Sequence, residues 1–171
     1  MASELTVQTI QGPASGANAN KIIVPSGQTL DVSSGSFTPA IGQIVQVVEG
    51  RIPGTGTSTS TSYVSDGPQV SITPTSVNNY IIAIAHSSSS IAGGWGYFKI
   101  QETTTNTSVV EIPWGNFSNS PQWLMGLSMV GKFQPTSTST LTFDIYGKCT
   151  AGTRYIHYTT TGMLTLMEIA Q

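Results

Sequence analysis

Short strand-like runs, closed by glycine, proline or clusters of serine and threonine, follow one another from Gly42 onward. The clearest run is LTFDIYGKC (141–149), in which apolar and polar residues alternate. This alternation predicts a strand with one buried and one solvent-facing side. The buried side would carry Leu141, Phe143, Ile145 and Cys149, and the solvent-facing side Thr142, Asp144, Tyr146 and Lys148. No stretch repeats apolar residues at intervals of three and four over two turns, so we predict no long helix.

A second run, YIIAIAH (80–86), is apolar on both faces and predicts a fully buried central strand. The serine- and glycine-rich stretch after it, residues 87–94, is expected to form a loop. Many short strands separated by turn residues are typical of β-sandwiches. We therefore expect an all-β head domain over residues 42–171, folded as an antiparallel, jelly-roll-like β-sandwich.

Charged residues are unusually scarce in this chain. They make up 8% of its 171 residues, against about 25% in ordinary soluble domains. Serine and threonine replace them, which suits a pleated β surface with many turns. The net charge is −2 with only six basic residues, so we expect no nucleic-acid binding. We also expect no membrane insertion and no signal peptide, and hence synthesis in a cytoplasm.

Residues 1–41 differ from the head and are expected to form an extended strand-turn leader. The stretch KIIVPSGQTLDV (21–32) holds two short β-type runs around a Pro25-Ser26-Gly27 turn. Strands this short cannot bury an apolar face alone. The leader therefore needs the head or other chains to pack against, and three leaders wound together would supply apolar partners.

Residues suited to catalysis or metal binding are few and dispersed. The eight carboxylates are well separated in the sequence, and His86 and His157 lack further ligands at metal-binding spacing. Cys149 is expected to be a small buried hydrophobic residue rather than a nucleophile. We therefore predict no catalytic residue, no metal site, no cofactor and no enzymatic function. A glycosidase would need two carboxylates that meet in space.

One loop rich in aromatic and amide side chains is a candidate carbohydrate site. Aromatic rings can stack on the apolar face of a sugar while amides bond its hydroxyls. The residues predicted to bind a glycan in this way are Trp114, Asn116, Asn119 and Trp123. The alternative for these aromatic residues is that they close the end of the sandwich core.

Both ends of the chain and the early head resemble a known group of proteins. LTVQTIQG (5–12), ANANKIIVPSGQTLDV (17–32) and GQIVQVV (42–48) are similar to the opening of small fibre-type structural proteins of tailed bacteriophages, especially marine and cyanobacterial ones. The same group is resembled by STSYV (60–64), by VSITP (70–74) with Ser76, Asn78 and Ile81, and by the closing TLMEIA (165–170).

The resemblance implies a virion protein that forms a homotrimer. Its leader would dock to other virion proteins, and its β head would point outward. A charge-poor surface suits packing against identical copies, and closed rotational symmetry covers exposed strand edges. The expected function is that of a short tail fibre or appendage whose trimeric head binds the host surface, with host carbohydrate as the candidate ligand.

Two alternatives stay open at this point. The chain is short and has no extended shaft, which favours a capsid decoration or head-fibre protein without a ligand. A glycan-degrading virion enzyme is the third possibility, and it would require a pair of converging carboxylates.

Overall fold

The computed structural model describes residues 13–17, 19, 22–29, 39–52, 56–114, 125–156 and 162–171. The chain divides into two units, Met1–Thr38 and Pro39–Gln171. In the first unit the predicted turn at Pro25-Ser26-Gly27 is confirmed, because the Gln28 amide donates to the Pro25 carbonyl at 3.0 Å. The β-type runs predicted on either side of this turn are not formed within residues 22–29, where no strand pairs with the backbone.

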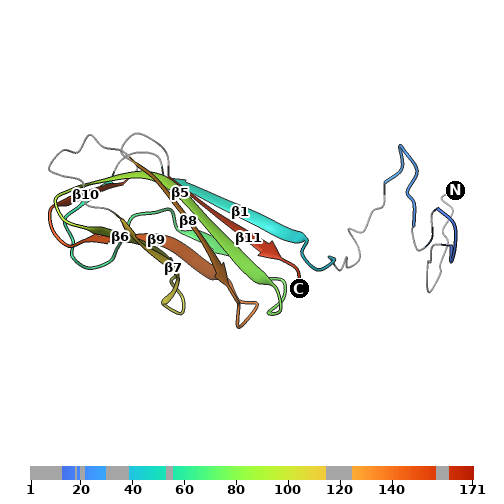
Figure 1. The fold of residues 1–171 in the computed structure, drawn as a ribbon. Helices are drawn as coiled ribbons and strands as arrows, with labels where there is room; N and C mark the ends of the chain where they lie inside the picture. Colours follow the sequence, from blue (N-terminus) through green and yellow to red (C-terminus); the bar gives the residue numbers. More distant parts are fainter. Residues whose placement is uncertain are drawn as a thin grey trace, which may run out of the picture. The chain divides into compact units, whose positions relative to one another are not determined.

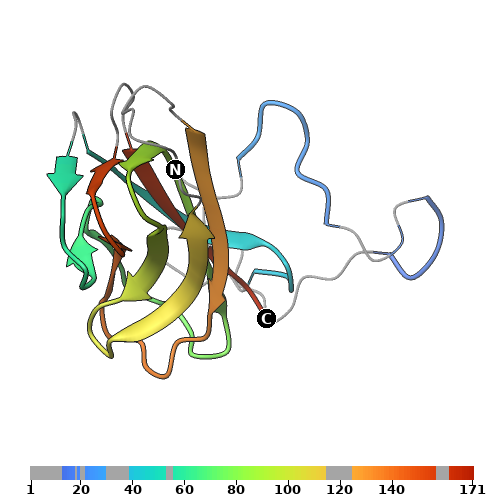
Figure 2. The ribbon, with the colours of Figure 1, turned by 60° about the vertical axis from the view of Figure 1, so that its left-hand side comes forward.

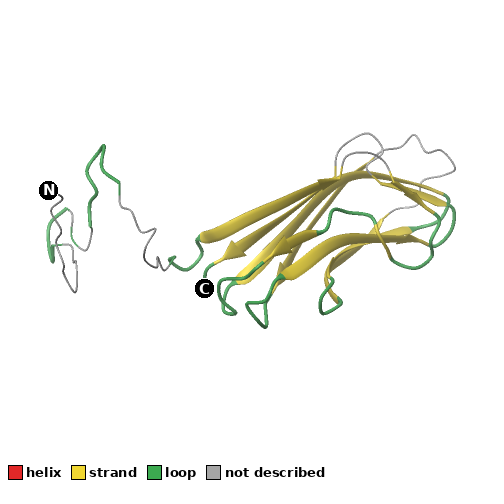
Figure 3. Ribbon diagram, turned by 180° about the vertical axis from the view of Figure 1, so that it is seen from behind, coloured by secondary structure: helices red, strands yellow, loops and turns green. Residues whose placement is uncertain are grey.

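The described residues of the second unit form strands and no helix (Figure 1 and Figure 3). The strands are β1 (Ile44–Ile52), β2 (Gly56–Ser58), β3 (Val64–Ser65), β4 (Val70–Ile72), β5 (Tyr80–Ala92), β6 (Gly96–Glu102), β7 (Thr107–Trp114), β8 (Met125–Phe133), β9 (Leu141–Cys149), β10 (Thr153–Ile156) and β11 (Gly162–Ile169).

These strands build two antiparallel sheets that pack face to face, one of them strongly curled (Figure 2). Sheet A has the order β1-β11-β5-β10-β2, with β8 on the other edge of β5, and sheet B has the order β3-β9-β6-β7, with β4 also on β9. If the short strands β2, β3 and β10 are set aside and the other eight are numbered in chain order, the sheets are 1-8-3-6 and 2-7-4-5. This is the double Greek-key order of a jelly roll, so the predicted jelly-roll-like sandwich is confirmed.

Strand β5 is longer than the sequence indicates. The predicted loop over residues 87–94 is wrong for most of its length, because β5 continues through four buried serines to Ala92. These small side chains fit inside the fold because β5 has a partner on each edge, β8 along one side and β10 along the other. The Ser89 hydroxyl donates to the Tyr155 carbonyl at 2.9 Å, which satisfies a buried polar group.

The core lies between the sheets and is built from alternate residues of their long strands. Phe98, Ile100, Phe143 and Ile145 of sheet B have no exposed surface. The rings of Phe143 and Phe133 meet edge to face, with centroids 5.4 Å apart. All four residues predicted on the buried side of 141–149 are buried, so this part of the prediction is confirmed. The side chains that point away from this core form the outer face of each sheet.

Candidate functional site

The predicted glycan loop lies almost entirely outside the described residues. Trp114 is the last residue of β7, and Asn116, Asn119 and Trp123 follow it outside the described part of the chain. Their assignment as a carbohydrate site therefore stays a prediction. Cys149 is buried with 1% of its surface exposed, as predicted.

Each of the four long strands of sheet A carries apolar side chains on its outer face, among polar ones that include Thr165, His86 and Lys132. Register places Val47 of β1 opposite Met167 of β11, and Met167 opposite Ile82 of β5. Two residues further along, Ile84 of β5 lies opposite Val130 of β8. We call Val47, Ile82, Ile84, Val130, Met163 and Met167 the apolar face of sheet A. These side chains are half-buried or exposed, up to 59% for Val130.

This apolar face corrects one interpretation of the sequence. The run 80–86 was expected to be fully buried because both of its faces are apolar, but only Ile81, Ala83 and Ala85 point into the core. Ile82 and Ile84 lie on the outer side, half-exposed. A single sheet of a monomer normally presents polar residues to water on its outer side, so the apolar face indicates a contact surface.

The outer face of sheet B is different in character and gathers tyrosines and lysines. Cross-strand register pairs Tyr97 with Lys148 and Lys99 with Tyr146 between β6 and β9. Tyr63, just before β3, completes the group, because the Nζ atoms of Lys99 and Lys148 each lie 4.4 Å from its ring centroid. We call these five residues the Tyr–Lys cluster. Its side chains are all half-buried.

The Tyr63 hydroxyl is a distinctive part of this cluster. It is buried, and no hydrogen bond of standard geometry satisfies it within the described residues. Burial, followed by the nearby Glu111 carboxylate, raises the pKa of Tyr63 well above its ordinary value. Tyr63 therefore stays neutral at any physiological pH and presents a ring, not a phenolate, to the two ammonium groups.

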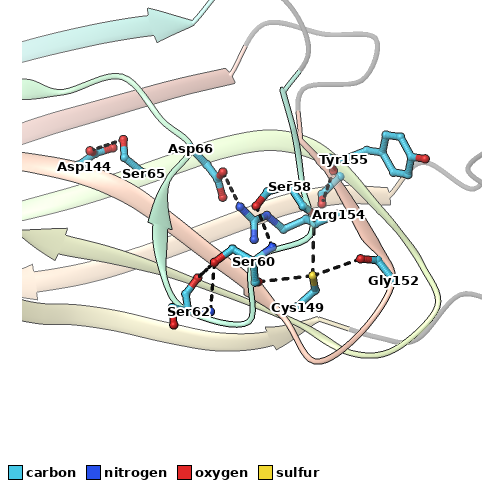
Figure 4. A network of polar contacts seen from close by, with 11 residues as sticks. Ser58, Ser60, Ser62, Ser65, Asp66, Asp144, Cys149, Gly152, Arg154 and Tyr155 are labelled. Atoms are coloured by element: carbon cyan, nitrogen blue, oxygen red, sulfur yellow. Dashed lines mark hydrogen bonds and ion pairs between the residues drawn. The ribbon is translucent and has the colours of Figure 1, made fainter.

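A charged network is buried between the sheets at the end of the sandwich near β10 (Figure 4). Arg154 of β10 is 1% exposed, and its Nη2 lies 2.5 Å from Asp66 Oδ1. The Arg154 guanidinium also lies 5.7 Å from the Phe98 ring centroid. Gly147 makes room for this pair, since a Cβ atom there would clash with both side chains.

Asp144 lies beside this network and corrects a second expectation. It was predicted on the solvent-facing side of its strand, and it does occupy that side of β9, but it has no exposed surface. The end of β3 and the segment after it cover Asp144, because Ser65 Oγ donates to Asp144 Oδ2 at 2.7 Å and Gln69 Nε2 donates to the same oxygen at 3.4 Å. Backbone bonds from Asp66 and Gly67 to the Ile145 carbonyl fix this segment in place.

The two acids are the converging carboxylates that an enzyme would need, but both are enclosed. Burial, with a smaller contribution from Asp144, raises the pKa of Asp66 to about 6 against the opposing effect of Arg154. Burial also raises the pKa of Asp144, and the hydrogen bonds from Ser65 and Gln69 oppose it. Asp144 holds the 65–69 segment against β9, and Asp66 joins the same segment to Arg154 of β10, so we assign both carboxylates a structural role.

Two further buried carboxylates organise turns. Burial alone would raise the pKa of Glu168, but hydrogen bonds from Gln46, Asn79 and Thr75 outweigh it, and the pKa is lowered. The same balance lowers the pKa of Glu102, which accepts bonds from Thr104 and Thr105 in the turn after β6. Both carboxylates are thus ionised supports for loops.

Among the residues with a described structure, no three His, Cys, Asp or Glu side chains converge to hold a metal ion. The same part of the chain contains no helix long and apolar enough to cross a membrane. No protein-family model matches the sequence, and a search of curated proteins also returns no match.

Proposed function

We propose that this protein is a structural protein of a bacteriophage virion, a short tail fibre or appendage whose trimeric β head contacts the host surface. The observation that carries this proposal is the apolar face of sheet A. The sequence resemblance to small phage fibre proteins supports the same function, because those proteins assemble from identical chains with a β head.

The partner that fits the apolar face is a further copy of the same chain. The face spans β1 to β8, with Glu49 at one edge, opposite Thr165, and Lys132 at the other, opposite Ile82. Glu49 is paired with Arg51 on the same strand at 2.6 Å, so the β1 edge carries little net charge and would not repel a second copy. With 8% charged residues, identical copies repel one another little.

The mass of the full-length protein in solution tests this assembly. A trimer has three times the 18.0 kDa of the chain, and light scattering after size-exclusion chromatography would report it. Val130→Asp places a charge on the apolar face and should yield the monomer. Val77→Asp changes another exposed valine, outside this face, and should leave the trimer intact. A wild-type protein that is monomeric at micromolar concentration would contradict the proposal.

Immunogold labelling of intact virions tests the location, with antibody raised against residues 42–171. Gold at the tail is the expected result for a host-binding appendage. Gold over the capsid would instead support the decoration or head-fibre alternative. Virions without gold would contradict a virion function of either kind.

A further inference from the structure

We infer that the Tyr–Lys cluster on the outer face of sheet B binds an acidic polysaccharide, through the sulfate or carboxylate groups of its sugars. This inference names the ligand class of the proposed host-binding head and rests on that proposal for the origin of the ligand. The binding chemistry itself follows from the side chains of the cluster.

Two of the six basic residues of the chain are brought together here. Since the Nζ atoms of Lys99 and Lys148 each lie 4.4 Å from the Tyr63 centroid, they are at most 8.8 Å apart. The length over which salt screens the interaction between two charges is similar to this distance, about 8 Å at physiological ionic strength. The positive potentials of the two ammonium groups therefore add, the Glu111 carboxylate opposite Lys99 offsets part of the sum, and an anion that contacts both lysines would offset more.

Neither lysine forms an ion pair within 4 Å with a carboxylate of the described residues. The ion pairs found there are Arg51–Glu49 and Arg154–Asp66, both away from the cluster. Glu111 lies opposite Lys99 in the register of β6 and β7, yet it makes no ion pair within 4 Å. The lysines contact aromatic rings, which leaves ammonium protons available to an anion.

The tyrosines supply the surface for the sugar rings. Tyr97 of β6 lies opposite Lys148 of β9. In the next pair on this face the lysine, Lys99, is on β6 and the tyrosine, Tyr146, is on β9. Aromatic and cationic groups therefore alternate both along and across strands β6 and β9. A sugar ring can contact a tyrosine while its anionic substituent reaches the neighbouring ammonium group. An extended polymer fits such a surface better than a small molecule does, since small-molecule sites are concave.

The first test compares binding of dextran sulfate and of uncharged dextran to the full-length protein by isothermal titration calorimetry. Binding of dextran sulfate alone, weakened by added salt, is expected. Polygalacturonate serves as the carboxylate-bearing probe and separates sulfate from carboxylate recognition. Tighter binding of a single-stranded oligonucleotide than of either polysaccharide would overturn the inference in favour of nucleic acid.

Variants then locate the site. Lys148→Gln and Lys99→Gln should each raise the Kd for dextran sulfate about tenfold, because each removes a charge-assisted hydrogen bond. Lys148→Arg keeps the charge and should retain binding. Arg51→Gln changes the net charge equally, at the edge of sheet A, and should leave the Kd unchanged. Equal losses in Arg51→Gln and Lys148→Gln would overturn the site, since they would reflect net charge alone.

The molecular mass of each sample separates this inference from the proposed function. A monomer that binds dextran sulfate through Lys99 and Lys148 would support the site and contradict the trimer. A trimer that binds none of the polyanions would overturn the site and leave the proposed assembly in place.

Discussion

Arg154 and Asp66 form an ion pair inside the sandwich, with Nη2 and Oδ1 2.5 Å apart and the arginine side chain 1% exposed. Arg154 follows the connection from β9 of sheet B to β10 of sheet A, and Asp66 follows β3 at the edge of sheet B. The pair therefore ties together segments that are distant in the sequence. Its energetics can be tested directly.

Removing the arginine leaves the buried Asp66 carboxyl without its counter-charge and raises the pKa of Asp66 further. Arg154→Met should lower the free energy of unfolding at pH 7.5 by about 3–5 kcal/mol, the usual cost of breaking a buried pair on one side. The loss should shrink at pH 5, where Asp66 can take up a proton. Urea denaturation at both pH values measures it. Arg51→Met, which breaks the exposed pair with Glu49, should cost about 0–1 kcal/mol, and equal losses in both variants would contradict the prediction.

The raised pKa of Asp66 predicts an unusual pH dependence of stability. Its pKa is about 6 in the folded state and 3.8 as the ordinary value. Between about pH 4 and pH 6 the folded state holds a proton that the unfolded state has released, so the free energy of unfolding falls as the pH rises, by on the order of 2–3 kcal/mol. Asp144, whose pKa is also raised, acts in the same direction.

Asp66→Asn is the matching variant, because an amide keeps an oxygen acceptor for Arg154 and does not titrate. Most of the decline between pH 4 and pH 6 should disappear in this variant. It should be at least as stable as the wild-type protein at pH 7.5. Thermal unfolding across the pH range provides the measurement, and a decline that persists at full size would show that Asp66 is not its source.

The sequence predicts the jelly roll well because alternation and turn residues act locally. The alternation over 141–149 places Phe143 and Ile145 in the core without any knowledge of the partner strands. Burial of Asp144 could not be predicted in the same way. It depends on the 65–69 segment lying over β9, a contact between parts of the chain far apart in the sequence.

The candidate surfaces depend on register between strands, which sequence patterns do not provide. Tyr97 and Lys148 belong to β6 and β9, and nothing in either strand indicates that the two residues are paired. In β5 the apolar pattern is equal on both faces, so it does not distinguish a central strand covered on both sides from one with an open outer face. The serine run 87–90 has the composition of a turn, and nothing within it indicates that β8 and β10 lie on its two edges.

Glu168 should be essential for the loop between β4 and β5. Its Oε1 accepts from the Thr75 amide at 2.8 Å and from Asn79 Nδ2 at 2.7 Å, while Oε2 accepts from Gln46 Nε2 at 2.6 Å. Glu168→Ala leaves these donors unsatisfied and should cost about 2–3 kcal/mol or more. Glu168→Gln keeps one oxygen and should cost less.

The contribution of Glu168 to the free energy of unfolding changes with pH in the direction opposite to that of Asp66. Its pKa is lowered below the ordinary 4.5, so its contribution to stability is complete above pH 4.5 and is lost as the pH falls through the lower, folded-state value. Hydrogen exchange of the Thr75 amide in wild type and in Glu168→Gln would report this loop locally. Unchanged protection in the variant would contradict the role of Glu168.

Two glycines at the crossing between the sheets provide a matched test of backbone geometry. Gly93 and Gly152 both have positive φ, 79° and 74°, a region that costs other residues about 1–2 kcal/mol. A Cβ atom at Gly152 would lie 1.9 Å from the Ala92 carbonyl oxygen, whereas at Gly93 its nearest neighbour would be 3.8 Å away.

Gly93→Ala should therefore lower the free energy of unfolding only by the cost of the backbone conformation, about 1–2 kcal/mol. Gly152→Ala adds a clash with the backbone that holds β5 to β10, and it should be several-fold more destabilising in urea denaturation. Similar losses of unfolding free energy in the two variants would contradict this prediction. They would mean that the turn can relax, and that Arg154 reaches the core without the close approach of Gly152 to Ala92.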